Sequence, residues 1–164
     1  DILNLQFTGS DSEKQHIIFS VGDEEFGVDV LRIQEIIRYV EPTKIPHAPD
    51  SMEGVINFRG KVIPVINLRK LFGLPKQSDN DFIVIIVIEI NGKTLGLTVD
   101  RVSDILNIPE DKIQPAQEFS TRAGTEYLKA MGKLGNRLVL ILDLDKIISL
   151  NNQKKLEEII AERF

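Results

Sequence analysis

Hydrophobic and polar residues alternate in short blocks along most of the chain, a pattern typical of β-strands rather than of long helices. The blocks are rich in β-branched and aromatic residues, and Gly, Pro or Asp separates them. In the first half we expect strands at residues 17–21, 25–28, 33–39, 55–58 and 61–66. In the second half we expect strands at residues 82–90, 94–99, 102–106, 129–134 and 137–142. Many short strands with turns between them predict small closed β-barrels, because closure removes exposed sheet edges.

Helical spacing is clearest at the C-terminus, where we expect a helix over residues 151–164. Asn151 can cap this helix, and Leu156, Ile159 and Ile160 form one apolar stripe along it. A surface helix usually buries such a stripe, so we expect this one to pack on a barrel. Shorter helical turns are expected at residues 49–53 and 68–72.

The second half of the chain repeats the first. Residues 26–37 match residues 95–106 at an offset of 69 residues (27 to 96), with identity at a glycine, a valine, an arginine and an isoleucine. Residues 62–71 match residues 138–147 at an offset of 76 residues (68 to 144). The second half therefore carries extra residues between the two matches, and the polar segment 111–125 is their expected place.

This duplication predicts an all-β protein made of two related barrels. Residues 1–14 form an N-terminal segment in this division of the chain. The first barrel takes residues 15–78, the second takes residues 79–150, and the C-terminal helix takes the remainder. A chain of 164 residues is long enough for two small cores of this kind.

Composition and charge exclude several classes of function. The formal net charge is -5, and no basic cluster of the kind that binds nucleic acid is visible. The chain has no cysteine, which removes disulfides, thiolate catalysis and cysteine-based metal sites and is compatible with a reducing cytoplasm. The most apolar run, residues 82–90, contains Glu89 and is too short to span a membrane. No secretory signal is visible at the N-terminus.

No group of residues in the sequence suggests catalysis, a cofactor or a metal. His16 and His47 stand alone, without the paired spacing of a zinc site. Asp143 and Asp145 lack the glycine and the terminal glutamate of a calcium loop. We therefore expect no catalytic residue, cofactor or metal ligand. The remaining alternative is an enzyme that uses these four residues between the barrels, and convergent polar groups with perturbed ionisation would identify it.

Residues that only one copy carries are candidates for binding rather than for folding. Arg59 lies at a turn between two strands, and its counterpart in the second copy is Gly135. A guanidinium binds carboxylates and carbonyls and keeps its charge, which suits a protein partner. A local salt bridge or a solvated side chain is the alternative, and the sequence leaves both open. Glu35 has the same ambiguity, since its counterpart Asp104 keeps the charge.

Five segments together resemble one known family. They are Phe-Gly-Val-Asp-Val at 26–30, Ile-Gln-Glu-Ile at 33–36, the run from Gly54 to Arg69, Val-Asp-Arg-Val at 99–102 and Leu-Asp-Leu-Asp-Lys at 142–146. With these segments the chain resembles the CheW family of bacterial chemotaxis adaptors over residues 15–160. The resemblance implies two SH3-like five-stranded β-barrels. It also implies an adaptor without enzymatic activity that links chemoreceptors to the histidine kinase CheA, in the cytoplasm but recruited to membrane-associated arrays.

The resemblance also implies two sets of binding residues. In the family the first barrel binds the regulatory domain of CheA, and the matching positions are Glu35, Ile36, Gly54, Arg59 and Gly60. The receptor tip binds an apolar groove between the barrels, and the matching positions are Ile17, Val30, Ile33, Val99 and Val102. The internal repeat agrees with the second set, since Val30 and Ile33 superpose on Val99 and Val102 at the offset of 69 residues. An apolar groove suits the apolar face of a helix.

One alternative within the same class stays open. The chain could be a CheW-like domain cut from CheA, or the amino-terminal part of CheV. The kinase would carry an ATP-binding region upstream, and CheV would carry a phosphoacceptor receiver downstream. The length of the intact gene would decide between these alternatives.

Overall fold

The computed structural model describes residues 15–76, 80–115 and 125–150 of the chain. Within these residues strands are the main secondary structure and the helices are short, so the all-β prediction is confirmed. The strands are β1 (Gln15–Val21), β2 (Glu24–Asp29), β3 (Ile33–Arg38), β4 (Met52–Phe58), β5 (Lys61–Asn67), β6 (Val84–Ile90), β7 (Lys93–Val99), β8 (Arg101–Asn107), β9 (Ile113–Pro115), β10 (Leu128–Leu134) and β11 (Arg137–Leu142).

Short helical elements lie between some of these strands and after the last one. They are the α-helices α1 (Leu68–Leu71) and α2 (Leu144–Leu150) and the 3-10 helices η3 (Val30–Arg32), η4 (Glu110–Lys112) and η6 (Thr125–Tyr127). The predicted turn of helix at 68–72 is therefore confirmed as α1. At 49–53 a single turn forms, closed by a hydrogen bond of 3.0 Å from the N–H of Met52 to the carbonyl of Pro49, but it does not become a helix because β4 begins at Met52. The predicted C-terminal helix at 151–164 lies outside the described residues.

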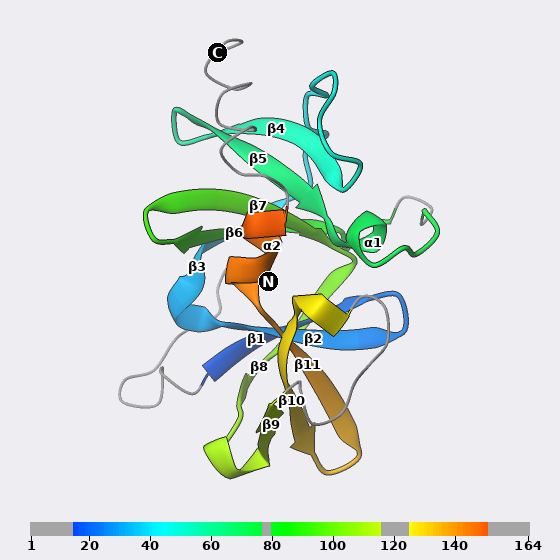
Figure 1. Cartoon of the computed structure of the whole chain (residues 1–164), viewed down its shortest axis with the longest axis vertical. Helices are drawn as coiled ribbons and strands as arrows, with labels where there is room; N and C mark the ends of the chain where they lie inside the picture. The colour runs from blue at the N-terminus through cyan, green and yellow to red at the C-terminus, as the bar shows by residue number, and fades with distance from the viewer. Residues whose placement is uncertain (1–14, 77–79, 116–124, 151–164) are drawn as a thin grey trace.

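The strands form two sheets that interleave the two halves of the sequence (Figure 1). One sheet has the order β8-β1-β2-β11-β10-β9, and the other has the order β3-β6-β7-β5-β4. Each sheet thus combines a hairpin from one half, β1–β2 or β6–β7, with strands from the other half. The predicted boundary between residues 78 and 79 does not coincide with the division between the two sheets, and the barrel limits 15–78 and 79–150 stay a prediction. The β9 strand adds a sixth member to the first sheet.

The strand register confirms the internal duplication itself. The parallel pair of β2 and β11 places Ile141 opposite Gly27, and the parallel pair of β7 and β5 places Val65 opposite Gly96. These are equivalent positions at the two offsets read from the sequence. Both glycines lie where a neighbouring strand approaches closely, since a Cβ on Gly96 would stand 2.9 Å from Cγ2 of Ile85. A Cβ on Gly27 would stand 3.0 Å from Cγ1 of Val139. The shared glycine is therefore a packing requirement of each sheet.

The largest hydrophobic cluster belongs to both sheets at once. It combines side chains of β1 and β2, such as Phe19 and Phe26, with side chains of β6 and β7, such as Ile86 and Leu97. Each sheet has only a small second cluster of its own. Because the main core lies across the sheets, it stabilises their association as well as each sheet.

Candidate protein-interaction surface

The β4–β5 turn holds Arg59 in an unusual backbone conformation. Both turn residues have positive φ, 52° at Arg59 and 81° at Gly60, as in a type I′ hairpin turn. The side-chain oxygen of Asn57 accepts a hydrogen bond of 2.9 Å from the backbone N–H of Gly60. A residue other than Gly, Asn or Asp in this region costs about 1 kcal/mol. The β10–β11 turn places Gly135, with φ 58°, at the equivalent position.

The Arg59 side chain projects into solvent from this turn. Its Nη2 donates to Oε1 of Glu35 on β3, and its guanidinium lies 5.2 Å from the ring centre of Phe58. The Arg59 side chain is 73% exposed and the Glu35 side chain 34% exposed. An ion pair so exposed contributes at most about 1 kcal/mol to folding. Most of the guanidinium N–H donors therefore stay available to a partner.

The ion pair joins β3 to the turn that directly follows β4, and β3 and β4 are at opposite ends of the strand order of their sheet. Ile37 of β3 packs against the cluster that contains Ile56 and Phe58 of β4. The sheet therefore curls until its two ends meet. This curvature brings Glu35 and Arg59, 24 positions apart in the chain, onto one surface.

The other residues predicted to bind the kinase are buried. Ile36 belongs to the large core. Gly54 is buried beneath the β3–β4 connection, where a Cβ would stand 2.3 Å from the carbonyl oxygen of Thr43. Two backbone hydrogen bonds of 2.8 and 2.9 Å join Thr43 to Val55 at this crossing. Burial gives Ile36 and Gly54 a structural role, and their contact with a partner stays a prediction.

The residues predicted to bind the receptor all belong to the large core or pack against it. Four of them, Ile17, Val30, Val99 and Val102, are at most 8% exposed, and Ile33 is partly buried. The structure thus brings the predicted set together, as the repeat suggested, but four of its side chains are covered. Their contact with a receptor stays a prediction, and Ile33 is the member that a partner can reach in this conformation.

The charged residues of the second copy form a different set of ion pairs. Arg137 at the start of β11 donates to Glu25 at 3.1 and 2.8 Å and to Asp104 at 2.9 Å. Hydrogen bonds to Glu25, then to Asp104, raise the pKa of the Arg137 guanidinium above its usual value. Asp104 is the counterpart of Glu35. Its carboxylate is therefore occupied from within the same sheet, whereas Glu35 pairs, among the residues that the structure describes, only with the exposed Arg59.

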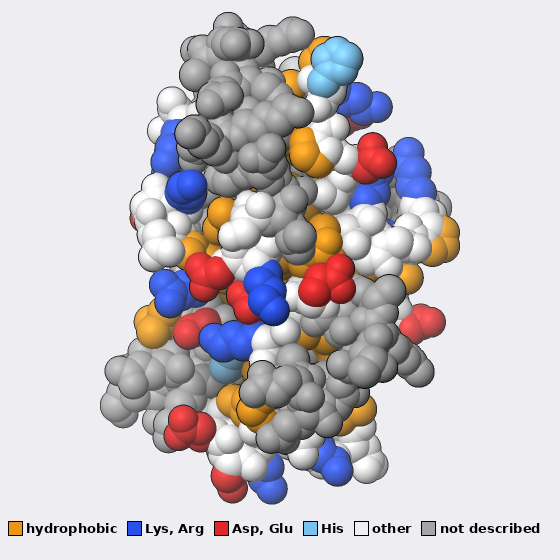
Figure 2. Space-filling view, in the orientation of Figure 1, with side chains coloured by type: hydrophobic (Ala, Val, Ile, Leu, Met, Phe, Trp, Pro, Cys, Tyr) orange, Lys and Arg blue, Asp and Glu red, His pale blue; other side chains and the backbone are white. Residues whose placement is uncertain are grey.

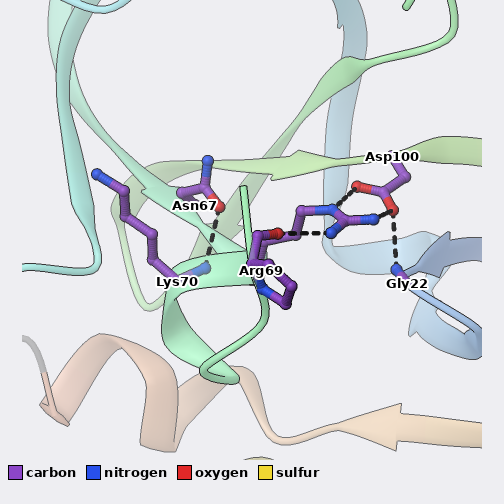
Figure 3. Close-up of polar contacts among 6 residues, drawn as sticks. Gly22, Asn67, Arg69, Lys70 and Asp100 are labelled. Atoms are coloured by element: carbon purple, nitrogen blue, oxygen red, sulfur yellow. Dashed lines mark hydrogen bonds and ion pairs between the residues drawn. The ribbon is translucent and has the colours of Figure 1, made fainter. Parts of the chain in front are cut away.

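A second arginine, Arg69, was missed in the sequence and links the two sheets (Figure 3). Its Nε and Nη2 donate to the two oxygens of Asp100 at 2.9 and 2.8 Å, and its Nη1 donates to the carbonyl of Pro75 at 2.7 Å. Asp100 also accepts from the backbone N–H of Gly22, in the β1–β2 turn, at 2.8 Å. The hydrogen bond to Asp100 raises the pKa of Arg69. The α1 helix is thereby fixed to both sheets.

The Arg69–Asp100 pair, like Arg59, has no equivalent elsewhere in the internal repeat. The counterpart of Arg69 is Asp145, and the counterpart of Asp100 is Leu31. The equivalent positions therefore have neither an arginine at the first nor a carboxylate at the second to form this ion pair. The pair therefore belongs to one side of the molecule only.

The residues considered for chemistry do not converge. His16 is buried in β1, while His47 is exposed in the β3–β4 connection. Asp143 caps α2, its Oδ1 accepting from the N–H of Lys146 at 3.2 Å, and Asp145 is exposed. Across the described residues no group of three or more His, Asp or Glu side chains is arranged to hold a metal ion. In the same part of the chain, every helix falls short of the length and apolar character that crossing a bilayer requires.

Comparison with known proteins identifies the family. The sequence profile of the CheW-like domain matches residues 15–152. The chain belongs to the CheW family. It is 38% identical over 144 residues to the chemotaxis protein CheW of Klebsiella aerogenes, which covers 88% of this chain and 87% of that one. It is 34% identical over 137 residues to the probable chemotaxis protein CheW of Rhizobium etli, covering 84% and 88% of the two chains.

A solved CheW structure agrees with the fold. The crystal structure of the scaffolding protein TtCheW from Thermoanaerobacter tengcongensis superposes with a TM-score of 0.74 at 36% identity. The match covers 80% of this chain and 89% of that one. The prediction of two SH3-like β-barrels, the fold of CheW proteins, is thereby confirmed.

Proposed function

We propose that this protein is a chemotaxis adaptor that couples chemoreceptors to the histidine kinase CheA by protein–protein binding, without catalysis of its own. Its place of action is the cytoplasm, at membrane-associated receptor arrays. Membership of the CheW family supports this proposal. The Arg59 turn is the surface that we assign to the kinase regulatory domain.

The observation that carries the assignment is the left-handed backbone of Arg59. At the same point of the second copy the chain uses Gly135, which adopts positive φ without strain. An arginine at this position costs backbone energy, and its exposed ion pair with Glu35 returns little of it. Backbone strain that persists at a single position favours a functional role for its side chain, such as binding a partner, over a role in folding. A guanidinium on a rim of this kind is a frequent anchor in protein interfaces.

Calorimetric titration with the CheA regulatory domain tests the assignment. We expect Arg59→Glu to weaken binding by about tenfold or more, because it places a negative charge beside Glu35 and removes the donor. Lys133→Glu is the matched control, since Lys133 is an exposed cation on β10 and undergoes the same change of charge. An unchanged affinity for folded Arg59→Glu, with Lys133→Glu also unchanged, would show that the kinase binds elsewhere.

The receptor side is tested best at Ile33. This residue packs against the core but stays partly exposed, so a polar substitution there leaves most of the packing in place. We expect Ile33→Ser to weaken binding of a receptor-tip hairpin, while Leu138→Ser, at an exposed leucine of β11, does not. Val99→Asp is unsuitable because it would bury a charge in the core and unfold the free protein. Equal receptor binding by both serine variants would refute the role of Ile33.

A further inference from the structure

Two hollows on the surface meet at the Arg69–Asp100 pair. The larger hollow, about 600 Å³, is lined by the β3–β4 connection, α1 and the end of β7. The smaller hollow, about 320 Å³, is lined by the β1–β2 turn, the segment before β6 and the start of β8. Arg69 and Asp100 line both, so the two hollows adjoin at this pair. We call the two adjoining hollows together the seam groove.

The two carboxylates in the floor of the seam groove are already satisfied. Asp100 accepts from Arg69 and from the backbone of Gly22. Glu53 accepts from the hydroxyl of Tyr39 at 2.5 Å and from the hydroxyl of Thr98 at 2.6 Å. These internal partners hold the floor in one arrangement. Both carboxylates therefore have hydrogen-bond partners without the nearby lysines.

The cations along the groove are, by contrast, uncommitted. Lys44, Lys70 and Lys76 are exposed and have no carboxylate partner in the part of the chain that the structure describes. Arg101, in the smaller hollow, lies 4.2 Å from the ring centre of Phe82 and likewise pairs with no described carboxylate. Figure 2 shows Lys and Arg side chains, with Asp and Glu among them, on the side of the molecule that carries α1 and elsewhere on the same face.

Acidic side chains near the groove are fewer. Glu41 borders the larger hollow and Asp23 the smaller, and both are exposed. Glu53 keeps its negative charge as well, because its partners are hydroxyls, so the four uncommitted cations exceed the carboxylates of Glu41, Asp23 and Glu53 by one charge. This local excess of positive charge contrasts with the whole chain, whose net charge is -5. Such a reversal favours a negatively charged partner at the groove.

The groove also has an aromatic side chain in each hollow. Phe82 is 54% exposed in the smaller hollow, and the ring of Tyr39 borders the larger one. Exposed rings beside cations are frequent anchors in protein interfaces. Two adjoining hollows with charge and aromatic surface along them fit an extended chain better than a compact ion.

We propose that the seam groove binds an extended acidic segment of a protein partner. This site is distinct from the two surfaces assigned above. Thr98 and Asp100 line the groove, while Val99 between them points into the core with the predicted receptor set. Arg101 and the buried Val102 alternate in the same way. The Arg59 turn, at the other end of β5 from α1, lines neither hollow.

A labelled peptide of alternating glutamate and alanine residues, followed by fluorescence anisotropy at low salt, tests the proposal on the full chain. We expect this peptide to bind, and the same peptide with glutamine in place of glutamate to bind about tenfold or more weakly. The double variant Lys44→Glu/Lys70→Glu should lose binding to a similar extent. Lys129→Glu/Lys133→Glu is the matched control, because both lysines are exposed on β10 and the change of net charge is the same.

Three outcomes would overturn the proposal. The first is equal binding of the two peptides, which would remove the role of charge. The second is an equal loss of binding in both double variants, which would attribute the effect to net charge alone. The third is competition by inorganic phosphate at the concentration of the peptide, which would make the groove a small-anion site. Arg59→Asn should bind the peptide normally, so a failed kinase assignment and a failed groove assignment remain distinguishable.

Discussion

The Arg69–Asp100 pair should couple the two sheets far more strongly than the exposed Arg59–Glu35 pair stabilises its barrel. We propose to remove each partner singly and together, with Arg69→Met and Asp100→Asn. Methionine keeps the unbranched length of the side chain, and asparagine keeps an oxygen for the N–H of Gly22. The same cycle with Arg59→Met and Glu35→Gln supplies the comparison.

The expected magnitude follows from burial and contacts. The Arg69 and Asp100 side chains are only 18% and 12% exposed, so solvent screens them little. A charge-assisted hydrogen bond contributes roughly 1.5–3 kcal/mol, and Arg69 makes two to Asp100 besides one to Pro75. After the cost of desolvation we expect Arg69→Met to lose about 2–4 kcal/mol and the cycle to give a coupling of about 2 kcal/mol. The exposed pair should give less than about 1 kcal/mol.

Urea unfolding followed by far-ultraviolet circular dichroism measures these free energies, since the chain has no tryptophan. In a thermal scan the Arg69→Met loss corresponds to a fall in Tm of roughly 4–16 °C for a chain of this length. A change in the urea m-value would indicate that the variant no longer unfolds in one step. A coupling between Arg69 and Asp100 no larger than that between Arg59 and Glu35 would refute the reasoning from burial.

Two further predictions concern the fold. Gly96→Ala should destabilise the protein by about 1–3 kcal/mol, because its Cβ would stand 2.9 Å from Ile85, whereas Lys129→Ala on an exposed face should leave Tm nearly unchanged. Fragments 1–78 and 79–164 should each lack cooperative unfolding and regain it on mixing, because each sheet needs strands from both; an independently folded fragment would contradict this.

The sequence predicted local structure well because strand formation leaves a local trace. Alternating residues and turn glycines located most strands, and Asn67, whose side chain caps α1, accompanies the predicted helical turn at 68–72. The short β9 strand was missed, since three residues in a polar segment carry no periodic signal. Its pairing with β10 depends on tertiary contacts.

The arrangement of strands into sheets could not be predicted in the same way. A hairpin such as β1–β2 has the same sequence pattern whether its third neighbour comes from its own half or from the other. The pairing of a hairpin with its third strand is decided by the joint burial of side chains far apart in the chain. Phe19 and Leu97, for example, belong to one hydrophobic cluster. The repeat correctly indicated equivalent elements, but equivalence does not say which copy an element packs with.

The candidate site was predicted in part for a related reason. Arg59 stood out because its counterpart is glycine, and the structure adds the cause, a left-handed backbone that glycine adopts freely. Val30 and Val99 match the receptor-contact positions of the family, yet a valine that contacts a partner and a valine in the core are identical in sequence. Only their burial, at most 4% exposed, separates these roles for the free protein.

The interleaved fold places the proposed surfaces in a fixed relation to one another. Arg59 lies at one end of β5, and α1 with Arg69 follows directly from the other end. Through Asp100 the same arginine reaches the turn of the β1–β2 hairpin, which belongs to the other sheet. A partner at the Arg59 turn and a partner in the seam groove would therefore share one rigid strand between them. An adaptor that must hold several proteins at set distances needs this kind of connection, and two barrels joined only by a linker would not provide it.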